Sequence, residues 1–148
     1  MKKIVFVCLG NICRSPMAEF IFKNALKSAG RSAEFEVSSR ATSYEEEGNP
    51  VYPPARAVLA KHGVSCAGKY ASRLQKSEYS SADLFVCMED KNVRDVLRIF
   101  GSDPEKKVVK LLDYTKKGGN IADPYYTGDF DLTYAQIEEG CRGLLASI

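Results

Sequence analysis

The stretch that decides the fold lies near the N-terminus and reads Ile4-Val5-Phe6-Val7-Cys8-Leu9-Gly10-Asn11-Ile12-Cys13-Arg14-Ser15-Pro16. Its first four residues are apolar and mostly β-branched, which is typical of a short strand that is buried on both faces. Ser15 and Pro16 have the residue types of a helix N-cap and a first helical residue. The stretch therefore predicts a strand, a loop over residues 8–14 and a helix.

This loop has the features of a phosphate-binding nest. Its backbone N–H groups can point at a tetrahedral anion, and the following helix directs its positive end to the same point. Gly10 and Asn11 tolerate the left-handed backbone angles that a nest requires. Arg14 carries a planar fork that can bind two phosphate oxygens. We therefore expect phosphate to be bound by Arg14 together with Leu9, Gly10, Asn11, Ile12, Cys13 and Ser15.

Cys8 is the candidate nucleophile. The helix dipole and a nearby guanidinium both stabilise a thiolate, and Ser15 can donate a hydrogen bond to it. His62 is the only histidine, so activation is expected to come from these groups. A thiolate beneath a bound phosphoryl group is placed for attack. The structural alternative, a buried strand-end thiol with Arg14 on the surface, leaves Gly10, Asn11 and Ser15 unexplained.

Strand-like and helical segments alternate along the rest of the chain. Strands are expected at residues 4–7, 35–39, 84–88 and 108–111, and helices at 16–29, 55–62, 90–100 and 132–146, with a loop at 43–54. This order predicts one α/β domain over residues 1–148, with a doubly wound, four-stranded parallel sheet and helices on both faces. Ligands of such folds bind beyond the carboxyl ends of the strands, where the loop after the first strand lies.

Composition excludes several classes of protein. A net charge of +2 with dispersed cations argues against nucleic-acid binding. No segment has the roughly 20 apolar residues that span a membrane, and the N-terminal apolar run is too short for a signal peptide. Five cysteines without a CxxC pair argue against a disulfide scaffold or a metal site. We expect a cytoplasmic protein, monomeric or weakly dimeric, without cofactor, metal, nucleic-acid or membrane partner.

The segment from Cys8 to Pro16 resembles the signature loop of the low-molecular-weight protein tyrosine phosphatases. A second segment, Asp123-Pro124-Tyr125-Tyr126, resembles the acid loop of that family. Three shorter matches fall in the family's order, so the resemblance covers essentially the whole chain: Gly48-Asn49-Pro50, His62-Gly63 and Cys87-Met88. The resemblance implies hydrolysis of phosphotyrosine in proteins, and of small aryl phosphates, through a phosphocysteine on Cys8.

The resemblance also implies roles outside the loop. Asp123 would protonate the leaving oxygen and then activate water; an Asx turn before Pro124 is the structural alternative. Tyr125 and Tyr126 would wall a slot for an aromatic ring, or else simply be buried. Either Tyr44 or Tyr52 would form the opposite wall.

Cys13 would form a reversible disulfide with Cys8, unless it is merely a small buried residue. The other cysteines, Cys66, Cys87 and Cys141, look like core or helix-face thiols. One feature departs from the family, whose members commonly carry a histidine that orients the loop asparagine. Lys69 or Tyr70 occupies that place, which leaves open what holds Asn11.

Four other functions compete with this interpretation. Arsenate reductases on the same scaffold need two further cysteines, and Cys87 sits in a buried strand pattern. Protein-arginine phosphatases tend to carry threonine where Ile12 stands, and they lack the paired tyrosines. A phosphoprotein-binding module predicts loss of Cys8, Arg14 or Asp123, all of which are present. A phosphocysteine carrier would need neither Arg14 nor a general acid.

Overall fold

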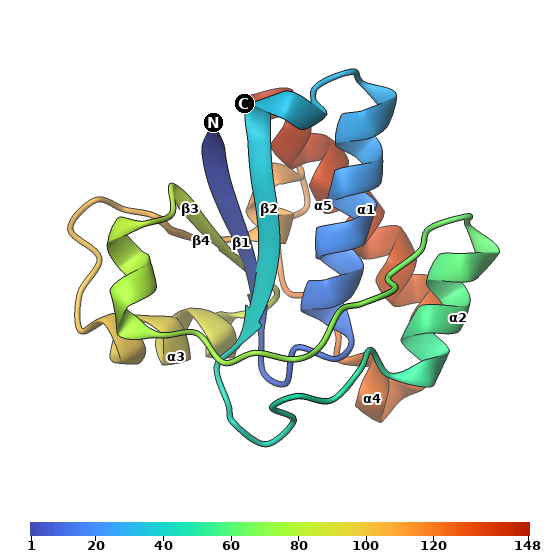
Figure 1. Ribbon diagram of the computed structural model, residues 1–148, viewed down its shortest axis with the longest axis horizontal. Coiled ribbons are helices and arrows are strands. Elements are labelled where there is room, and N and C mark those ends of the chain that lie inside the picture. Colours follow the sequence, from blue (N-terminus) through green and yellow to red (C-terminus); the bar gives the residue numbers. More distant parts are fainter.

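The computed structural model describes residues 1–148 and contains a parallel sheet of four strands in the order β2-β1-β3-β4 (Figure 1). The strands are β1 (Lys2–Cys8), β2 (Phe35–Ala41), β3 (Leu84–Cys87) and β4 (Val108–Lys110). The helices are α1 (Arg14–Ser28), α2 (Pro53–Lys61), α3 (Asp90–Phe100), α4 (Pro124–Thr127) and α5 (Phe130–Ser147). The predicted doubly wound α/β fold is confirmed.

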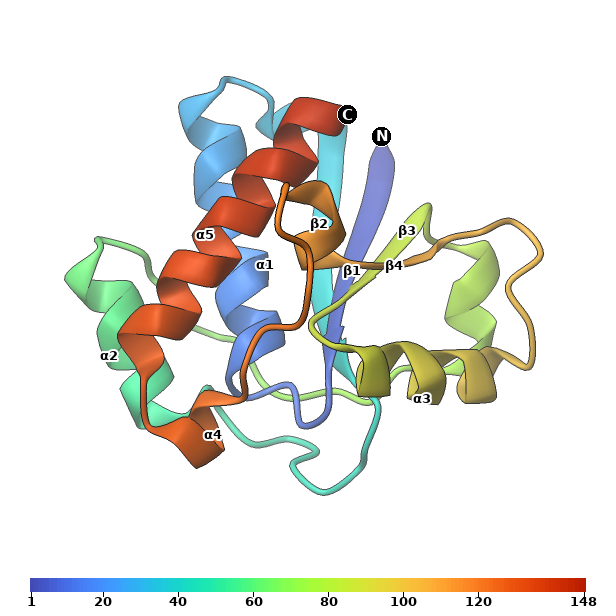
Figure 2. The same ribbon diagram turned by 180° about the vertical axis from the view of Figure 1, so that it is seen from behind.

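The central strand β1 is buried on both faces. Ile4 and Phe6 belong to the core that α1 and α5 cover, whereas Val5 and Val7 pack with residues of α3. Figures 1 and 2 show α1 and α5 side by side on one face of the sheet and α3 on the other. This double burial is the reason why the strand reads as a continuous apolar run.

Three helix starts differ from the prediction. Helix α2 begins at Pro53 and not at residue 55, because proline fits the first turn of a helix. The other two starts differ for another reason. Helix α1 begins at Arg14, so Ser15 lies inside the helix and does not cap it; its hydroxyl is engaged by Cys8 and Asn11 instead. Helix α5 begins at Phe130, where the side chain of Asp129 caps it by accepting from the N–H of Leu132 at 2.9 Å. Both differences arise because side-chain partners, and not residue type alone, decide where a helix starts.

Helix α4 was not predicted. It is a single turn within the segment that resembles the acid loop, with Asp123 at its N-cap and Pro124 at its first position. Gly128 ends it in the left-handed conformation, which is the usual role of a glycine at this position. The turn fixes the backbone on which Asp123 and the two tyrosines stand.

Helix α5 packs closely on the 3-10 turn Leu111–Tyr114, which precedes the acid loop. A Cβ atom at Gly143 would lie 2.0 Å from the carbonyl oxygen of Tyr114, and one at Gly140 would lie 2.5 Å from Cγ of Leu111. Only glycine fits at such distances. The two glycines therefore anchor one end of the loop that carries Asp123.

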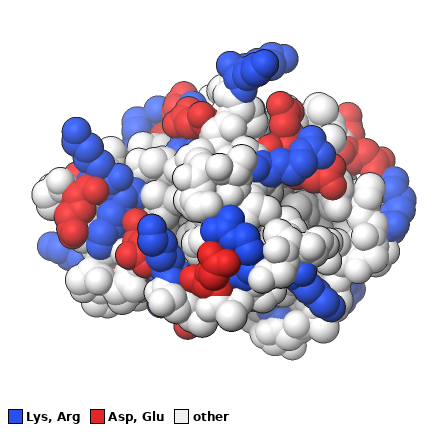
Figure 3. All heavy atoms as spheres, turned by 90° about the horizontal axis from the view of Figure 1, so that it is seen from above, with Lys and Arg blue, Asp and Glu red and all other residues white.

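The sheet order places a topological switch point between β1 and β3, because the chain moves outward from these strands in opposite directions. Both chain termini lie at the end of the sheet opposite the carboxyl ends of the strands (Figure 1). The face that carries the termini shows basic and acidic side chains intermixed (Figure 3). None of the helices is both long and apolar enough to span a membrane.

Candidate active site

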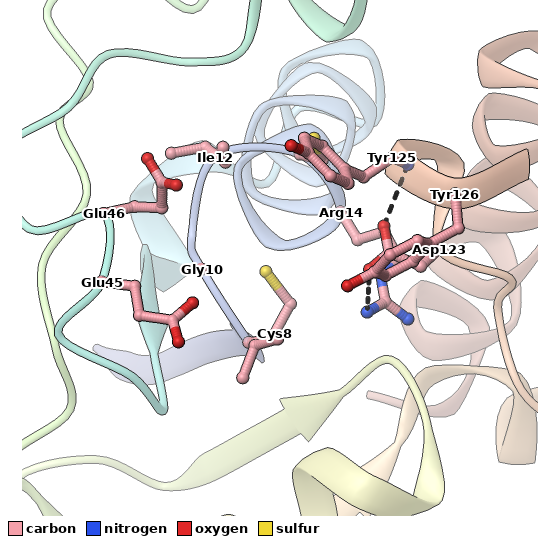
Figure 4. A pocket seen from close by; sticks show the side chains of 11 residues that line it. Cys8, Gly10, Ile12, Arg14, Glu45, Glu46, Asp123, Tyr125 and Tyr126 are labelled. Carbon is pink, nitrogen blue, oxygen red and sulfur yellow. Dashed lines mark hydrogen bonds and ion pairs between the residues drawn. The ribbon is translucent and has the colours of Figure 1, made fainter. Parts of the chain in front are cut away.

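A cavity of about 240 Å³ opens where β1 ends (Figure 4). It is lined by Cys8, Leu9, Gly10, Ile12, Cys13, Arg14, Glu45, Glu46, Asp123, Tyr125 and Tyr126. The structure thus brings the loop, the acid-loop aspartate and both tyrosines together around one space. Two further predicted residues, Asn11 and Ser15, do not line the cavity but lie buried behind Cys8.

The sulfur of Cys8 is surrounded by hydrogen-bond donors. The backbone N–H of Asn11 donates to Sγ at 3.2 Å, and the hydroxyl oxygen of Ser15 lies 3.0 Å from it. Because this hydroxyl already accepts from Nδ2 of Asn11 at 2.7 Å, its own proton can be given to the sulfur. Donors aimed at sulfur favour the anionic form over the neutral thiol.

Asn11 is the residue that bends the loop. Its φ is 58°, in the left-handed region, whereas Gly10 is not among the residues with positive φ. Of the two residues that tolerate such angles, only Asn11 uses one, and Gly10 stands in the cavity wall with the Glu46 side chain beside it. Asparagine tolerates this conformation better than most residues, because its short polar side chain can bond locally.

A buried polar network holds the side chain of Asn11. Its Nδ2 also donates to the hydroxyl of Ser39 at 3.0 Å, and its Oδ1 accepts from the backbone N–H of Ser72 at 3.1 Å. Ser39 in turn donates to Oε1 of Glu19 at 2.6 Å. Asn11, Ser39 and Glu19 are all buried. Their hydrogen bonds fix the loop from behind.

Lys69 supplies the positive charge of this network. Its Nζ donates to the carbonyl oxygen of Ser39 at 3.0 Å and lies 3.7 Å from Oε1 of Glu19, with only 10% of its side chain exposed. Burial lowers the pKa of Lys69, and the Glu19 carboxylate opposes that effect. Lys69 rather than Tyr70 therefore takes the place left open by the missing histidine. His62 lies elsewhere and stacks on Tyr134 at 3.8 Å.

Arg14 is held by groups from two parts of the chain. Its Nη1 donates to a carboxylate oxygen of Glu89 and to the carbonyl oxygen of Ile121 at 2.8 Å, and its Nη2 lies 3.5 Å from Oδ2 of Asp123. Glu89 was not predicted as a site residue. Glu89 comes two residues after the end of β3. Ligands of such folds bind beyond the carboxyl ends of the strands, so the same rule that indicated the loop after β1 would also have indicated Glu89.

Asp123 caps a turn and also faces the cavity. One carboxylate oxygen, Oδ1, accepts from the backbone N–H of Tyr125 at 3.0 Å and caps α4. The other oxygen, Oδ2, pairs with Arg14 across the cavity. Figure 4 shows the carboxylate beside the guanidinium at the cavity. The turn therefore positions Asp123 without using the oxygen that a substrate would meet.

The aromatic wall is only partly as expected. Tyr125 and Tyr126 line the cavity and are 59% and 80% exposed. Tyr52 supports Tyr125 from the side, with ring centroids 5.6 Å apart, but neither Tyr52 nor Tyr44 lines the cavity. The expected aromatic opposite wall is wrong: Glu45 and Glu46 stand there instead (Figure 4).

The remaining cysteines divide into two groups. Cys13 lines the cavity, and burial together with the nearby Cys8 raises its pKa to about 12, so Cys13 is a neutral thiol at physiological pH. Cys66, Cys87 and Cys141 are buried away from the cavity. Burial raises the pKa of each of these three thiols. They have the properties of core residues.

A doubly wound sheet whose first strand ends in such an anion-binding cysteine loop, faced by an aspartate, defines a small α/β phosphatase. Comparison with known proteins gives the same class. The sequence profile described as "Low molecular weight phosphotyrosine protein phosphatase" matches residues 3–148. The chain belongs to this family, and it is a phosphatase enzyme.

Individual relatives match over nearly their whole length. The low molecular weight protein-tyrosine-phosphatase YfkJ of Bacillus subtilis is 33% identical over 150 residues, which cover 100% of this chain and 96% of that protein. The low molecular weight phosphotyrosine protein phosphatase of Homo sapiens is 33% identical over 97% of this chain and 94% of its own. The crystal structure of YfkJ superposes with a TM-score of 0.97 over 100% of this chain and 94% of that one.

A crystal structure described as a drosophila arginine phosphatase has the same fold. It is 26% identical, covers 99% of this chain and 97% of that one, and has a TM-score of 0.89. Fold likeness alone therefore does not separate phosphotyrosine from phosphoarginine as the substrate. Which of the two substrates is preferred depends on the side chains that line the cavity.

Proposed function

We propose that the protein hydrolyses phosphotyrosine in phosphoproteins, with Cys8 as nucleophile, Asp123 as general acid and base, and residues 1–148 as one catalytic domain. The observation that carries this proposal is the arrangement around one cavity of a sulfur with donors aimed at it, a buried arginine and a carboxylate. No metal takes part in the proposed chemistry. The enzyme family is shown by the comparisons, whereas the mechanism and the residue roles rest on the geometry.

In the first step the Cys8 thiolate attacks phosphorus and the bond from phosphorus to the tyrosyl oxygen breaks. Asp123 gives its proton to that oxygen, so tyrosine leaves as a neutral phenol and the phosphoryl group remains on sulfur. Nε of Arg14 donates to no protein group, and Nη2 meets only Asp123. These two nitrogens are free to hold two oxygens of the phosphoryl group in a fork.

In the second step water attacks the phosphocysteine. The Asp123 carboxylate, deprotonated by the first step, accepts a proton from this water, and the bond from phosphorus to sulfur breaks. The products are inorganic phosphate and the Cys8 thiolate, which the N–H of Asn11 and the Ser15 hydroxyl stabilise again. The enzyme returns to its starting state without a cofactor.

The walls of the cavity favour an aromatic leaving group. Ile12 and Tyr125 both line it, and an apolar chain and an aromatic face can enclose a phenyl ring. A phosphoarginine would instead present a polar guanidino group to the apolar side chain of Ile12. An arsenate reductase would need further cysteines in reach of Cys8, and Cys13 is the only other one in this cavity.

One comparison of substrates tests the function. With a metal chelator present, we expect the protein to hydrolyse p-nitrophenyl phosphate and a phosphotyrosine peptide, and to prefer the latter to a matched phosphoarginine peptide. Released phosphate and thiol-dependent arsenate reduction are measured in parallel. Preference for phosphoarginine, reduction of arsenate, or loss of all activity on chelation would each contradict the proposal.

The buried network predicts an effect at Lys69, far from the substrate. Replacing Lys69 with methionine removes the cation that faces Glu19 and Ser39. The hydrogen bonds that hold the side chain of Asn11 then weaken. We expect kcat/KM for p-nitrophenyl phosphate to fall about tenfold, which corresponds to a loss of roughly 1.4 kcal/mol in transition-state stabilisation. The rate at which iodoacetate alkylates Cys8 at neutral pH should fall at the same time.

Lys23 offers a matched control. It pairs with the other oxygen of Glu19 at 2.7 Å, but its side chain is 44% exposed. We expect Lys23→Met to change kcat/KM less than twofold, because an exposed ion pair contributes little. Equal losses in the two variants, or a Lys69→Met enzyme with unchanged alkylation and unchanged kcat/KM, would mean that the network does not position the loop.

A further inference from the structure

A second cavity, of about 350 Å³, lies beside the catalytic one. The two share Leu9 and Glu45 as a common wall. The rest of its lining comes from the segment after β2, from the chain near Arg73 and from the second half of α3: Thr42, Ser43, Arg73, Asp95, Arg98 and Ile99. Most of these side chains are charged or carry hydroxyl groups, so the cavity fits a polar occupant and not an aromatic ring.

Arg73 is a half-buried cation without an ion-pair partner. Its Nε donates to the carbonyl oxygen of Thr42 at 3.3 Å, and its Nη1 donates to that of Leu74 at 2.8 Å. The guanidinium also lies over the ring of Tyr44, 4.8 Å from its centroid. These contacts hold the group in place and leave Nη2 unbonded, and the nearby Glu47 accepts from the backbone N–H of Arg73 at 2.9 Å without pairing with its guanidinium. A preorganised guanidinium of this kind is suited to bind a carboxylate or a phosphate.

The wall formed by α3 adds a second cation. Arg98 pairs with Asp95 at 3.0 Å, and its side chain is 76% exposed, so it can turn toward an occupant. Asp95 is also paired with Lys91 at 3.4 Å, which means that two cations neutralise this one carboxylate. The hydroxyl of Thr42 is buried and has no hydrogen-bond partner, which leaves it available to a bound group.

Glu45 is a second carboxylate in the lining of this cavity. It stands between the two cavities, and in Figure 4 its carboxylate points toward the catalytic side. The charges that line the second cavity are Arg73 and Arg98 against Asp95 and the outward-turned Glu45, with Lys91 close to Asp95. The cavity therefore attracts an anion, at a place that a substrate chain bound at Cys8 reaches by passing over Leu9.

We propose that this second cavity is an accessory subsite that binds an anionic side chain of the substrate, a carboxylate or a second phosphate, near the phosphotyrosine. The inference rests on the proposed function, since the phosphotyrosine must occupy the catalytic cavity. Because the two cavities share a wall, the anionic residue lies close to the phosphotyrosine along the substrate chain. The subsite selects acidic or multiply phosphorylated segments as substrates.

A set of peptides tests the subsite. Each carries one phosphotyrosine and, at one flanking position, alanine, lysine, aspartate or phosphoserine, so that the carboxylate and the phosphate are compared directly. For the unaltered enzyme we expect kcat/KM to be about fivefold higher for an acidic flank than for alanine, the upper range for a partly exposed ion pair. The preference should decline as salt is added.

Two variants assign the preference to the cavity. We expect Arg98→Ala, and also Arg73→Gln, to lower kcat/KM for the acidic peptides to the alanine value while hydrolysis of p-nitrophenyl phosphate is unchanged. Arg142→Ala is the matched control, because Arg142 is an exposed helix arginine paired with Glu138 at 3.4 Å on α5. It should keep the preference.

The outcomes separate the two proposals. Equal kcat/KM for acidic and alanine peptides, or a preference that persists in both cavity variants, overturns the subsite and leaves the phosphatase function standing. If no phosphotyrosine peptide is hydrolysed, the proposed function fails, and calorimetric binding of the same peptides to the Cys8→Ser protein still measures the subsite. Tighter binding of acidic peptides there supports it, and equal binding overturns it.

Discussion

Replacing Cys8 with serine will abolish turnover of p-nitrophenyl phosphate, lowering kcat by more than about 10⁴-fold. The loop directs the N–H of Asn11 and the Ser15 hydroxyl at the sulfur, but it contains no base that could take a proton from a serine hydroxyl. The chain's one histidine, His62, is stacked on Tyr134 outside the cavity. Steady-state kinetics at saturating substrate measure the loss.

The second cysteine of the loop provides the control. Cys13 lines the same cavity and is a neutral thiol, since burial raises its pKa to about 12. We expect Cys13→Ser to keep most of the activity. The Cys8→Ser protein should still gain thermal stability from inorganic phosphate, because Arg14 and the loop backbone remain. Full activity of Cys8→Ser would eliminate the phosphocysteine mechanism.

Removing the proton donor gives the second largest effect. We expect Asp123→Ala to slow hydrolysis of phosphotyrosine by about 10²–10⁴-fold, the usual contribution of general acid–base catalysis. The loss should be smaller for p-nitrophenyl phosphate, whose leaving group needs less protonation. Single-turnover kinetics on the two substrates measure this difference.

Asp123 also caps α4, so a structural effect has to be separated from the chemical one. Asn is as good an N-cap as Asp, and Asp123→Asn keeps an oxygen for the N–H of Tyr125 while it removes the proton donor. We expect Asp123→Asn to be as slow as Asp123→Ala. A rate near that of the unaltered enzyme would show that Asp123 serves only to cap the turn.

The parts of the site that could be predicted follow from local sequence patterns. Residues 4–16 combine an apolar run, a loop with Asn11 and a helix start, and each of these is decided by neighbours in the chain. The parts that could not be predicted are side chains brought in from other elements. Glu89 meets Arg14 from the end of β3, and Lys69 meets Glu19 from a loop. The strand order could have placed Glu89 at this edge of the sheet, but an isolated glutamate or lysine has no local signature that distinguishes a buried partner from a solvated one.

The wall opposite the tyrosines shows the same limit. Tyr44 and Tyr52 were the natural candidates by residue type, and both lie in the right loop. The bend of that loop instead presents Glu45 and Glu46 to the cavity, while Tyr44 lies against Arg73 and Tyr52 against Tyr125. Direction within an irregular loop follows from its tertiary contacts, because no helical or strand period sets it.

The sequence alone predicted the α/β fold, the strand–loop–helix unit with Cys8 and Arg14, and Asp123 as the partner of that unit. These follow from hydrophobic periodicity, from the few residue types that a phosphate-binding loop admits, and from the resemblance to a known family. Only the tertiary structure decided how Asn11 is held, what orients Arg14 and which charges surround the cavities. The reason is physical: hydrogen bonds and ion pairs form between side chains that are close in space, and only folding determines which side chains those are.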